Sequence, residues 1–158
     1  MSRAQPPGPA LVIGIGHPDR GDDAVGRIVA GRLNERPPVG FRVVETDGEA
    51  AKLIDLFGGA DDVIIVDAGR SGAAAGTIHR LDAAFPLPRP MFAMSSHALG
   101  LVESVELART LGQLPERCIV FAVEAARFDL GAGLSPAVAE AVDDVVARVL
   151  EEIGAEVT

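Results

Sequence analysis

Apolar and polar residues follow one another along this chain in the order expected of strands that alternate with helices. Short, mainly apolar runs predict buried strands at residues 10–16, 41–45, 63–66 and 119–123. Longer stretches repeat apolar residues every three or four positions, which predicts amphipathic helices over residues 22–35, 49–57, 98–111 and 136–153. Apolar strands alternating with helices predict an α/β fold in which a mostly parallel sheet is covered on both faces.

Two segments depart from this alternation. Residues 77–81 alternate apolar and polar side chains, which predicts an edge strand with one face in water. Residues 85–90 contain three prolines, so no regular structure is expected there. We expect one domain over residues 10–158, preceded by a proline-rich, disordered lead-in at residues 1–9.

Acidic side chains follow the predicted strands at the point where each strand ends. Asp22 and Asp23 follow the first strand, Asp47 the second, Asp67 the third and Glu124 the last. A histidine, His97, is expected to open the helix that leads into that last strand. If the strands are parallel, these groups share one edge of the sheet, and carboxylates gathered there repel one another unless protonated or joined by a cation. Two carboxylates and an imidazole would suit a borderline divalent metal.

Each of these residues also has an explanation that involves no chemistry. Asp22 or Asp23 could cap the helix that follows, and Asp67 could form a turn at a strand end. His97 could be an ordinary residue at the start of a helix; alternatively, Ser95 and Ser96 could cap that helix, which would leave the imidazole free. Likewise, Asp47-Gly48 is a common turn pair, Glu124 could bind backbone N–H groups, His79 could face solvent, and Cys118 could be a core thiol.

Charge and composition exclude several classes of function. A net charge of −9 disfavours nucleic acid and anionic membrane surfaces as partners. No apolar run approaches the roughly 20 residues of a membrane span, and with one cysteine the chain can form no internal disulfide, so we expect a cytoplasmic protein. There is no Gly-x-Ser-x-Gly elbow of a serine hydrolase. Since Lys52 is the sole lysine, the sequence also lacks a phosphate-binding loop of the Walker type and the C-terminal lysine of receiver domains.

Four motifs, taken in their order and spacing, resemble one family. They are Gly14-Ile15-Gly16-His17-Pro18-Asp19-Arg20-Gly21-Asp22-Asp23-Ala24-Val25-Gly26, then Val66-Asp67-Ala68, Ser96-His97-Ala98-Leu99-Gly100-Leu101 and Gly133-Leu134-Ser135-Pro136. Over about residues 11–153 the sequence resembles the hydrogenase maturation proteases, endopeptidases that trim the C-terminus of the large subunit of [NiFe] hydrogenase.

The resemblance implies a three-layer α/β sandwich with a five-stranded sheet. It also implies that Asp23, Asp67 and His97 contact a metal, namely nickel already placed in the large-subunit precursor, so that no tightly bound cofactor is expected. Zinc or another divalent ion could take the place of nickel. His17, Asp22, Asp47 and Glu49 are the expected substrate contacts.

Three positions depart from the family pattern. The family usually has Asn at the position of His17 and a second glycine at the position of Glu49, and some relatives carry Glu where this chain has Asp23. The segment around Glu49 is associated with substrate selection, which leaves open which hydrogenase is the substrate.

The catalytic step stays open at this level, because no nucleophile–base pair is visible. A metal could polarise the scissile carbonyl or activate water, and a carboxylate, Asp23 or Asp47, could act as general base. A different class of function also fits the same fold, namely a non-catalytic checkpoint module that binds the metal or the partner without cutting.

Overall fold

The computed structural model describes residues 10–94, 97 and 99–154. Five strands form one sheet in the order β2-β1-β3-β5-β4, and β4 is antiparallel to its neighbour β5 while the other pairs are parallel. The strands are β1 (Ala10–Ile15), β2 (Phe41–Thr46), β3 (Asp62–Gly69), β4 (Ile78–Asp82) and β5 (Arg117–Glu124). The helices are α1 (Val25–Glu35), α2 (Ala50–Gly58), α3 (Leu101–Thr110) and α4 (Pro136–Ile153), with 3₁₀ turns η1 (Gly21–Ala24) and η2 (Arg89–Phe92).

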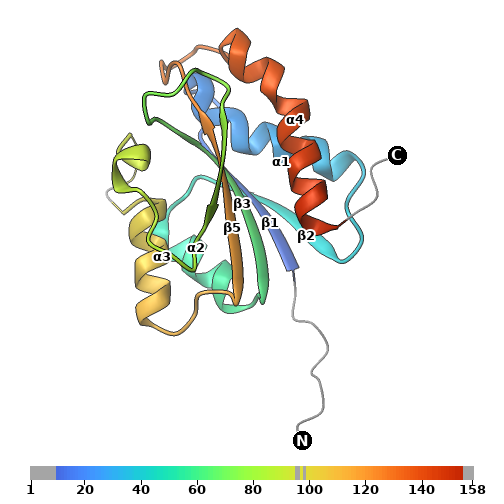
Figure 1. The fold of residues 1–158 in the computed structure, drawn as a ribbon, viewed down its shortest axis with the longest axis vertical. Coiled ribbons are helices and arrows are strands. Elements are labelled where there is room, and N and C mark those ends of the chain that lie inside the picture. The colour runs from blue at the N-terminus through green and yellow to red at the C-terminus, as the bar shows by residue number, and fades with distance from the viewer. Residues whose placement is uncertain (1–9, 95–96, 98, 155–158) are drawn as a thin grey trace, which may run out of the picture.

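Helices cover both faces of the sheet, which makes three layers (Figure 1). Helices α1 and α4 pack together over one face, and α2 and α3 pack together over the other. Two apolar cores result, one containing Val25, Ile64 and Val145 and the other Leu53, Ile65 and Val105. Because successive residues of a strand point to opposite faces, the continuous apolar run in β3 supplies both cores. The predicted fold class is confirmed, and so is the predicted edge strand, β4, which the structure shows to be antiparallel to β5.

Glycines in the first motif let α1 begin directly on the sheet. A Cβ at Gly26 would overlap the backbone carbonyl oxygens of Ile15 and Val66, and a Cβ at Gly14 would overlap that of Gly26. At Gly21 the φ angle is +54°, a conformation that other residues rarely adopt. The glycine spacing therefore fixes where the turn η1, which carries Asp22 and Asp23, lies against the ends of β1 and β3.

Three predicted element boundaries are wrong in ways that affect the site. The first helix does not begin at Asp22, because Gly21–Ala24 form a 3₁₀ turn and α1 starts at Val25. The strand β3 continues beyond Asp67 to Gly69, paired with β5, so Asp67 lies within the strand. Helix α3 begins at Leu101, where the Glu103 side chain accepts the Gly100 N–H at 2.9 Å, and His97 therefore precedes the helix.

Other parts of the prediction fall in and around irregular segments. The proline-rich segment 85–90 runs into the 3₁₀ turn η2, which begins at Arg89. The predicted lead-in at residues 1–9 and the possible caps Ser95 and Ser96 lie outside the described residues. None of the helices in the described part of the chain is both long enough and apolar enough to cross a membrane.

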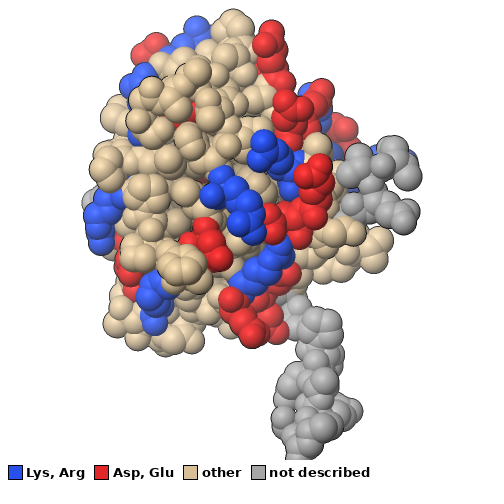
Figure 2. Space-filling view, viewed as in Figure 1, with Lys and Arg blue, Asp and Glu red and all other residues tan. Residues whose placement is uncertain are grey.

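Charged side chains of both signs are interspersed over the side of the molecule that carries α4 (Figure 2). Several are paired, such as Arg32 with Asp143 and Arg80 with Glu152, and Glu152 also accepts a hydrogen bond from Arg117. These ion pairs connect α1, β4 and β5 to α4, away from the cavity-lining aspartates.

Candidate active site at the carboxyl edge of the sheet

A cavity lies at the carboxyl ends of the parallel strands, and its lining has two chemically different parts. Asp23, Asp47 and Asp67 supply carboxylates, one from the turn η1, one from the residue after β2 and one from β3. The apolar part of the lining consists of Ile15, Met91, Phe92, Met94, Leu101 and Phe128. The topology thus brings the three aspartates predicted from the strand ends around one space.

Asp67 is the most deeply buried of the three carboxylates. Its residue is 9% exposed, and its Oδ1 accepts the backbone N–H of Ala68 at 2.8 Å. Burial raises the pKa of Asp67 well above its usual value, the negative charge of Asp23 raises it further, and the hydrogen bond from Ala68 opposes this only in part. Asp67 and Asp23 therefore destabilise each other's charged form, which a cation placed between them would relieve.

Asp23 is half-buried and is held by the loop that precedes it. Its Oδ2 accepts the backbone N–H of His17 at 3.1 Å. Burial raises the pKa of Asp23, and the nearby charges of Arg20, His17 and His97 and the bond from His17 do not fully offset it. The interpretation of Asp23 as a cap of α1 is therefore wrong. Asp23 faces the cavity from a turn fixed by its own loop.

Asp47 and His97 lie next to each other at the same edge of the sheet. The Nε2 atom of His97 is 3.8 Å from Oδ1 of Asp47. The backbone N–H of Glu49 donates to that same Oδ1 at 3.1 Å, and Lys52 approaches Oδ2 at 3.4 Å. The Glu49 bond holds the pKa of Asp47 below its usual value against a smaller opposing effect of burial, and Lys52 and His97 lower it further. Asp47 is therefore a charged carboxylate at neutral pH.

Electrostatic effects connect the predicted metal-contacting residues in this structure. The negative charge of Asp23 raises the pKa of Asp67, and the charge of His97 lowers that of Asp23, while Nε2 of His97 lies 3.8 Å from Oδ1 of Asp47. In the described part of the chain, no three His, Cys, Asp or Glu side chains are arranged closely enough to hold a metal ion. The assignment of Asp23, Asp67 and His97 as metal contacts stays a prediction, and the neighbours Ser95, Ser96 and Ala98 lie outside the described residues.

The four residues predicted to contact substrate differ in their placement. His17 and Glu49 are partly exposed beside Asp23 and Asp47, to which each donates its backbone N–H. Asp47 lines the cavity itself. The expectation that Asp22 contacts substrate is wrong. Its side chain is fully buried, and its oxygens accept hydrogen bonds from Ala126, Arg127 and Ser135. A substrate cannot reach it.

Glu124, at the end of β5, belongs to a separate cluster. Its carboxylate accepts hydrogen bonds from the backbone N–H and hydroxyl of Ser71 at 2.7 and 2.6 Å and lies 3.0 Å from Nε2 of His79. Burial would raise the pKa of Glu124, but these hydrogen bonds outweigh it and hold the pKa below its usual value. The expectation that Glu124 satisfies backbone N–H groups is confirmed, whereas the expectation that His79 faces solvent is wrong.

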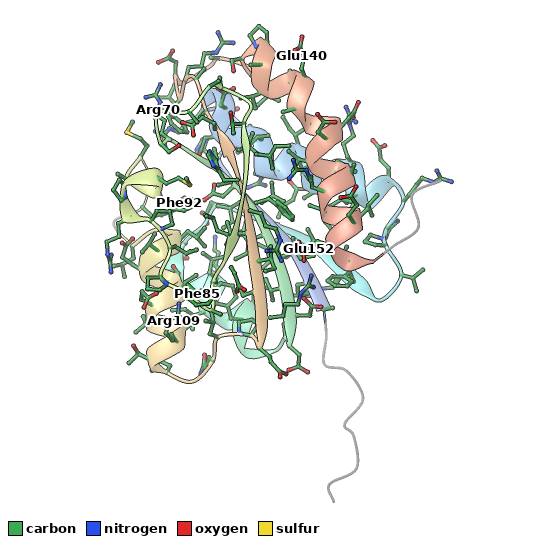
Figure 3. The ribbon with its side chains drawn as sticks, viewed as in Figure 1. Arg70, Phe85, Phe92, Arg109, Glu140 and Glu152 are labelled. Atoms are coloured by element: carbon green, nitrogen blue, oxygen red, sulfur yellow. The ribbon has the colours of Figure 1, made fainter. Side chains whose placement is uncertain are left out.

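The sequence did not reveal the apolar wall of the cavity. Met91 and Phe92 come from η2, in the segment expected to be irregular, and Phe128 comes from the loop after β5. Phe128 is partly covered by Arg70, whose guanidinium carbon lies 5.5 Å from the ring centre. In Figure 3, Arg70 lies at the end of the molecule opposite to Phe85 and Arg109. The sequence did contain one signal for this wall, because Phe128 is an aromatic residue in a polar loop that follows the carboxyl end of a predicted strand.

Comparisons with known proteins agree with this architecture. A family model described as hydrogenase maturation protease, HycI, matches residues 29–152. Two hydrogenase expression/formation proteins HupD, from Rhodobacter capsulatus and Thiocapsa roseopersicina, are 28% and 29% identical over 155 and 146 residues. These alignments cover 94% and 89% of this chain and 74% and 66% of the relatives. The hydrogenase maturating endopeptidase HybD from E. coli superposes with a TM-score of 0.76 at 25% identity, over 92% of this chain and 91% of HybD.

Proposed function

Because this chain belongs to the hydrogenase maturation protease family, we propose that it removes a C-terminal extension from the large-subunit precursor of a [NiFe] hydrogenase. Membership of this family makes the protein a hydrolase of peptide bonds. Its substrate, and the nickel ion that would trigger cleavage, are what we propose. The observation that carries this proposal is the cavity at the carboxyl edge of the sheet, where three carboxylates face an apolar wall. In our proposal, a segment of the precursor tail lies in this cavity next to the bound cation.

In this proposal the nickel ion belongs to the substrate, and Asp23, Asp67 and His97 contact it as the precursor tail enters the cavity. The buried position of Asp67 and its repulsion by Asp23 support this assignment, because a divalent cation lowers the cost of holding both charges. Carboxylate oxygens and an imidazole nitrogen also form a donor set that suits a borderline metal. Binding to these residues would report that nickel insertion is complete.

The cleavage step requires a group that accepts the proton of the attacking water. As water adds to the scissile carbonyl carbon, its proton passes to a carboxylate, and that proton then goes to the leaving amine as the C–N bond breaks. Asp23 and Asp47 are the two candidates for this group. Both line the cavity, and neither carboxylate has all its oxygens occupied by buried hydrogen-bond donors. Cys118 is excluded as the nucleophile, because it is buried in the core beneath α3 and burial raises the pKa of its thiol to about 12.

Cleavage of a nickel-loaded precursor, followed by intact-mass spectrometry, tests the proposal. The parent protein should shorten the precursor, and Asp23→Asn should slow this by about 100-fold or more, as expected for a lost acid–base or electrostatic contact. Asp47→Asn measured alongside shows which carboxylate the chemistry needs. Asp143→Asn is the matched control, because it removes the same charge from a side chain that is 82% exposed on α4.

The two possible negative results have different meanings. If the parent binds the precursor and leaves its mass unchanged, the chain is a checkpoint module and not a peptidase. If cleavage occurs and both Asp23→Asn and Asp47→Asn match the parent rate, then carboxylate catalysis at this cavity is wrong.

A further inference from the structure

The carboxylate next to Asp23 in sequence is bound by a distant part of the chain. Asp22 is 0% exposed, and its Oδ2 accepts the backbone N–H groups of Ala126 at 2.7 Å and Arg127 at 3.1 Å. The same oxygen accepts the hydroxyl of Ser135 at 2.8 Å, and Oδ1 accepts the backbone N–H of Ser135 at 2.7 Å. Four donors from a segment more than 100 residues away thus converge on one side chain.

The backbone adds further bonds between these two segments. The N–H of Asp22 donates to the carbonyl oxygen of Arg127 at 2.9 Å, and the N–H of Gly21 donates to the carbonyl oxygen of Ala132 at 3.1 Å. The N–H of Gly131 donates to the carbonyl of Asp19 at 2.7 Å. The turn η1 and the segment between β5 and α4 are therefore joined along their length, with the Asp22 carboxylate at the centre of the joint.

The joined segments carry residues that line the cavity from two sides. Asp23 directly follows Asp22, and Phe128 directly follows Arg127. Displacement of either segment would therefore move a cavity-lining side chain, one a carboxylate and the other part of the apolar wall. Since catalysis depends strongly on placement, with about 100-fold lost for a misplacement of about 1 Å, the joint has a direct route to the reaction.

We propose that Asp22 is a positioning residue, whose carboxylate fixes the turn that carries Asp23 to the segment that carries Phe128. This inference rests on the proposed function, because the reaction that Asp22 supports is cleavage of the precursor tail. It assigns to Asp22 a role different from substrate contact, and it explains why two acidic residues follow one another in the motif. Asp22 serves the architecture of the cavity, and Asp23 faces its contents.

Only a carboxylate at position 22 can accept all four hydrogen bonds. Asparagine has the same shape, but its NH₂ group would face either the Ser135 N–H or the three donors on the other oxygen. Glutamate adds a methylene to a side chain that has no free space around it. Asp22→Asn therefore breaks the joint with the least change in volume. Ser135→Ala weakens it more gently, because the backbone bonds to Asp22 remain.

The experiment compares Asp22→Asn, Ser135→Ala and a matched control, Ser104→Ala. Ser104 is also buried and donates a single side-chain hydrogen bond of 2.8 Å, but its partner is the carbonyl of Gly100 at the start of α3. Thermal unfolding of each variant is first followed by circular dichroism, and a temperature is chosen at which every variant is folded. At that temperature, kcat and KM for precursor cleavage are measured for each variant. The same measurements are repeated with each substitution combined with Asp23→Asn.

We expect Asp22→Asn to lower kcat by about 10- to 100-fold and Ser135→Ala by several-fold, whereas Ser104→Ala retains the parent kcat. Because part of the effect of Asp22 passes through Asp23, Asp22→Asn should lower kcat much less in the Asp23→Asn background than in the parent. Additive losses in the double variant, or unchanged kcat in both Asp22→Asn and Ser135→Ala, would overturn the proposal. Should Asp22→Asn fail to fold, the Ser135→Ala and Ser104→Ala pair decides alone.

A second readout is independent of activity and separates the two proposals. Amide hydrogen exchange at Ala126 and Arg127, whose N–H groups are bound by Asp22, should accelerate by about tenfold in Ser135→Ala and remain unchanged in Ser104→Ala. A parent protein that cleaves nothing, with exchange altered as expected, refutes the proposed function and leaves the joint in place. Unaltered exchange refutes the joint whether or not the parent cleaves the precursor.

Discussion

Replacing Asp67 by asparagine should make the free protein more stable and at the same time inactive. The asparagine carbonyl can still accept the Ala68 N–H that now lies 2.8 Å from Oδ1, and the side chain has nearly the same volume. What disappears is a charge that is costly to bury and that Asp23 repels. A residue kept at a cost to stability is typical of a functional site.

The direction of the change in stability follows from two opposing effects. Each unit by which the folded-state pKa exceeds the unfolded value costs about 1.4 kcal/mol once the pH lies above both. Against this, a neutral acceptor binds the Ala68 N–H less strongly than a carboxylate, by about 1 kcal/mol. Because burial raises the pKa of Asp67 well above its usual value, we expect the first effect to be the larger one, so that Asp67→Asn is more stable than the parent at neutral pH and has a higher Tm.

The pH dependence identifies the cause. Because the pKa of Asp67 is raised in the folded state, the carboxyl is protonated in both states below the unfolded value of about 3.9, and its burial then costs no extra stability. As the pH rises above that value, the parent loses stability until the folded-state pKa is passed, while Asp67→Asn does not. The difference in Tm between the two proteins should thus be small near pH 4 and largest near neutrality.

Thermal unfolding followed by circular dichroism, together with precursor cleavage, is the assay. Asp143→Asn is again the control for net charge, and its Tm should differ little from the parent at every pH. Cleavage by Asp67→Asn should fall by about 100-fold or more, since the variant lacks the charge that we propose contacts the nickel of the substrate. A lower Tm for Asp67→Asn, by the same amount at pH 4 and pH 7, would show that Asp67 has a structural role and would refute the reasoning.

Two further predictions concern packing. Gly26→Ala should lower Tm sharply, by the equivalent of several kcal/mol, because the added Cβ overlaps backbone carbonyl oxygens, whereas Gly31→Ala on the same helix meets nothing within 4 Å and should add about 0.5–1 kcal/mol of stability. Cys118 should resist alkylation by iodoacetamide at pH 8 in the folded protein and react on unfolding, since burial raises its pKa to about 12; rapid labelling of the folded form, measured by mass spectrometry, would contradict its placement in the core.

Local patterns along the chain were sufficient to predict the architecture and the edge of the sheet that carries the cavity. The apolar run Val63–Val66 predicted a buried strand, which the structure confirms within β3, and Asp67 after it was expected at the carboxyl edge of the sheet. These features depend on neighbours in sequence, so a single sequence contains them.

Properties that depend on distant segments could not be predicted in the same way. Asp22 and Asp23 are chemically identical neighbours. Their roles differ because hydrogen-bond donors from residues 126–135, more than 100 positions later in the sequence, bind the Asp22 carboxylate. The continuation of β3 beyond Asp67 depends on its pairing with β5, and the contact between His97 and Asp47 depends on where α3 begins. Each of these required the tertiary structure.

Nickel dependence of cleavage tests the central claim most directly. The same large-subunit precursor is prepared with and without nickel, incubated with equal amounts of this protein, and followed by intact-mass spectrometry over time. Our account predicts loss of the C-terminal extension from the nickel-loaded precursor and an unchanged mass for the nickel-free form. Equal rates of cleavage for the two forms would contradict the claim that Asp23, Asp67 and His97 recognise nickel held by the substrate.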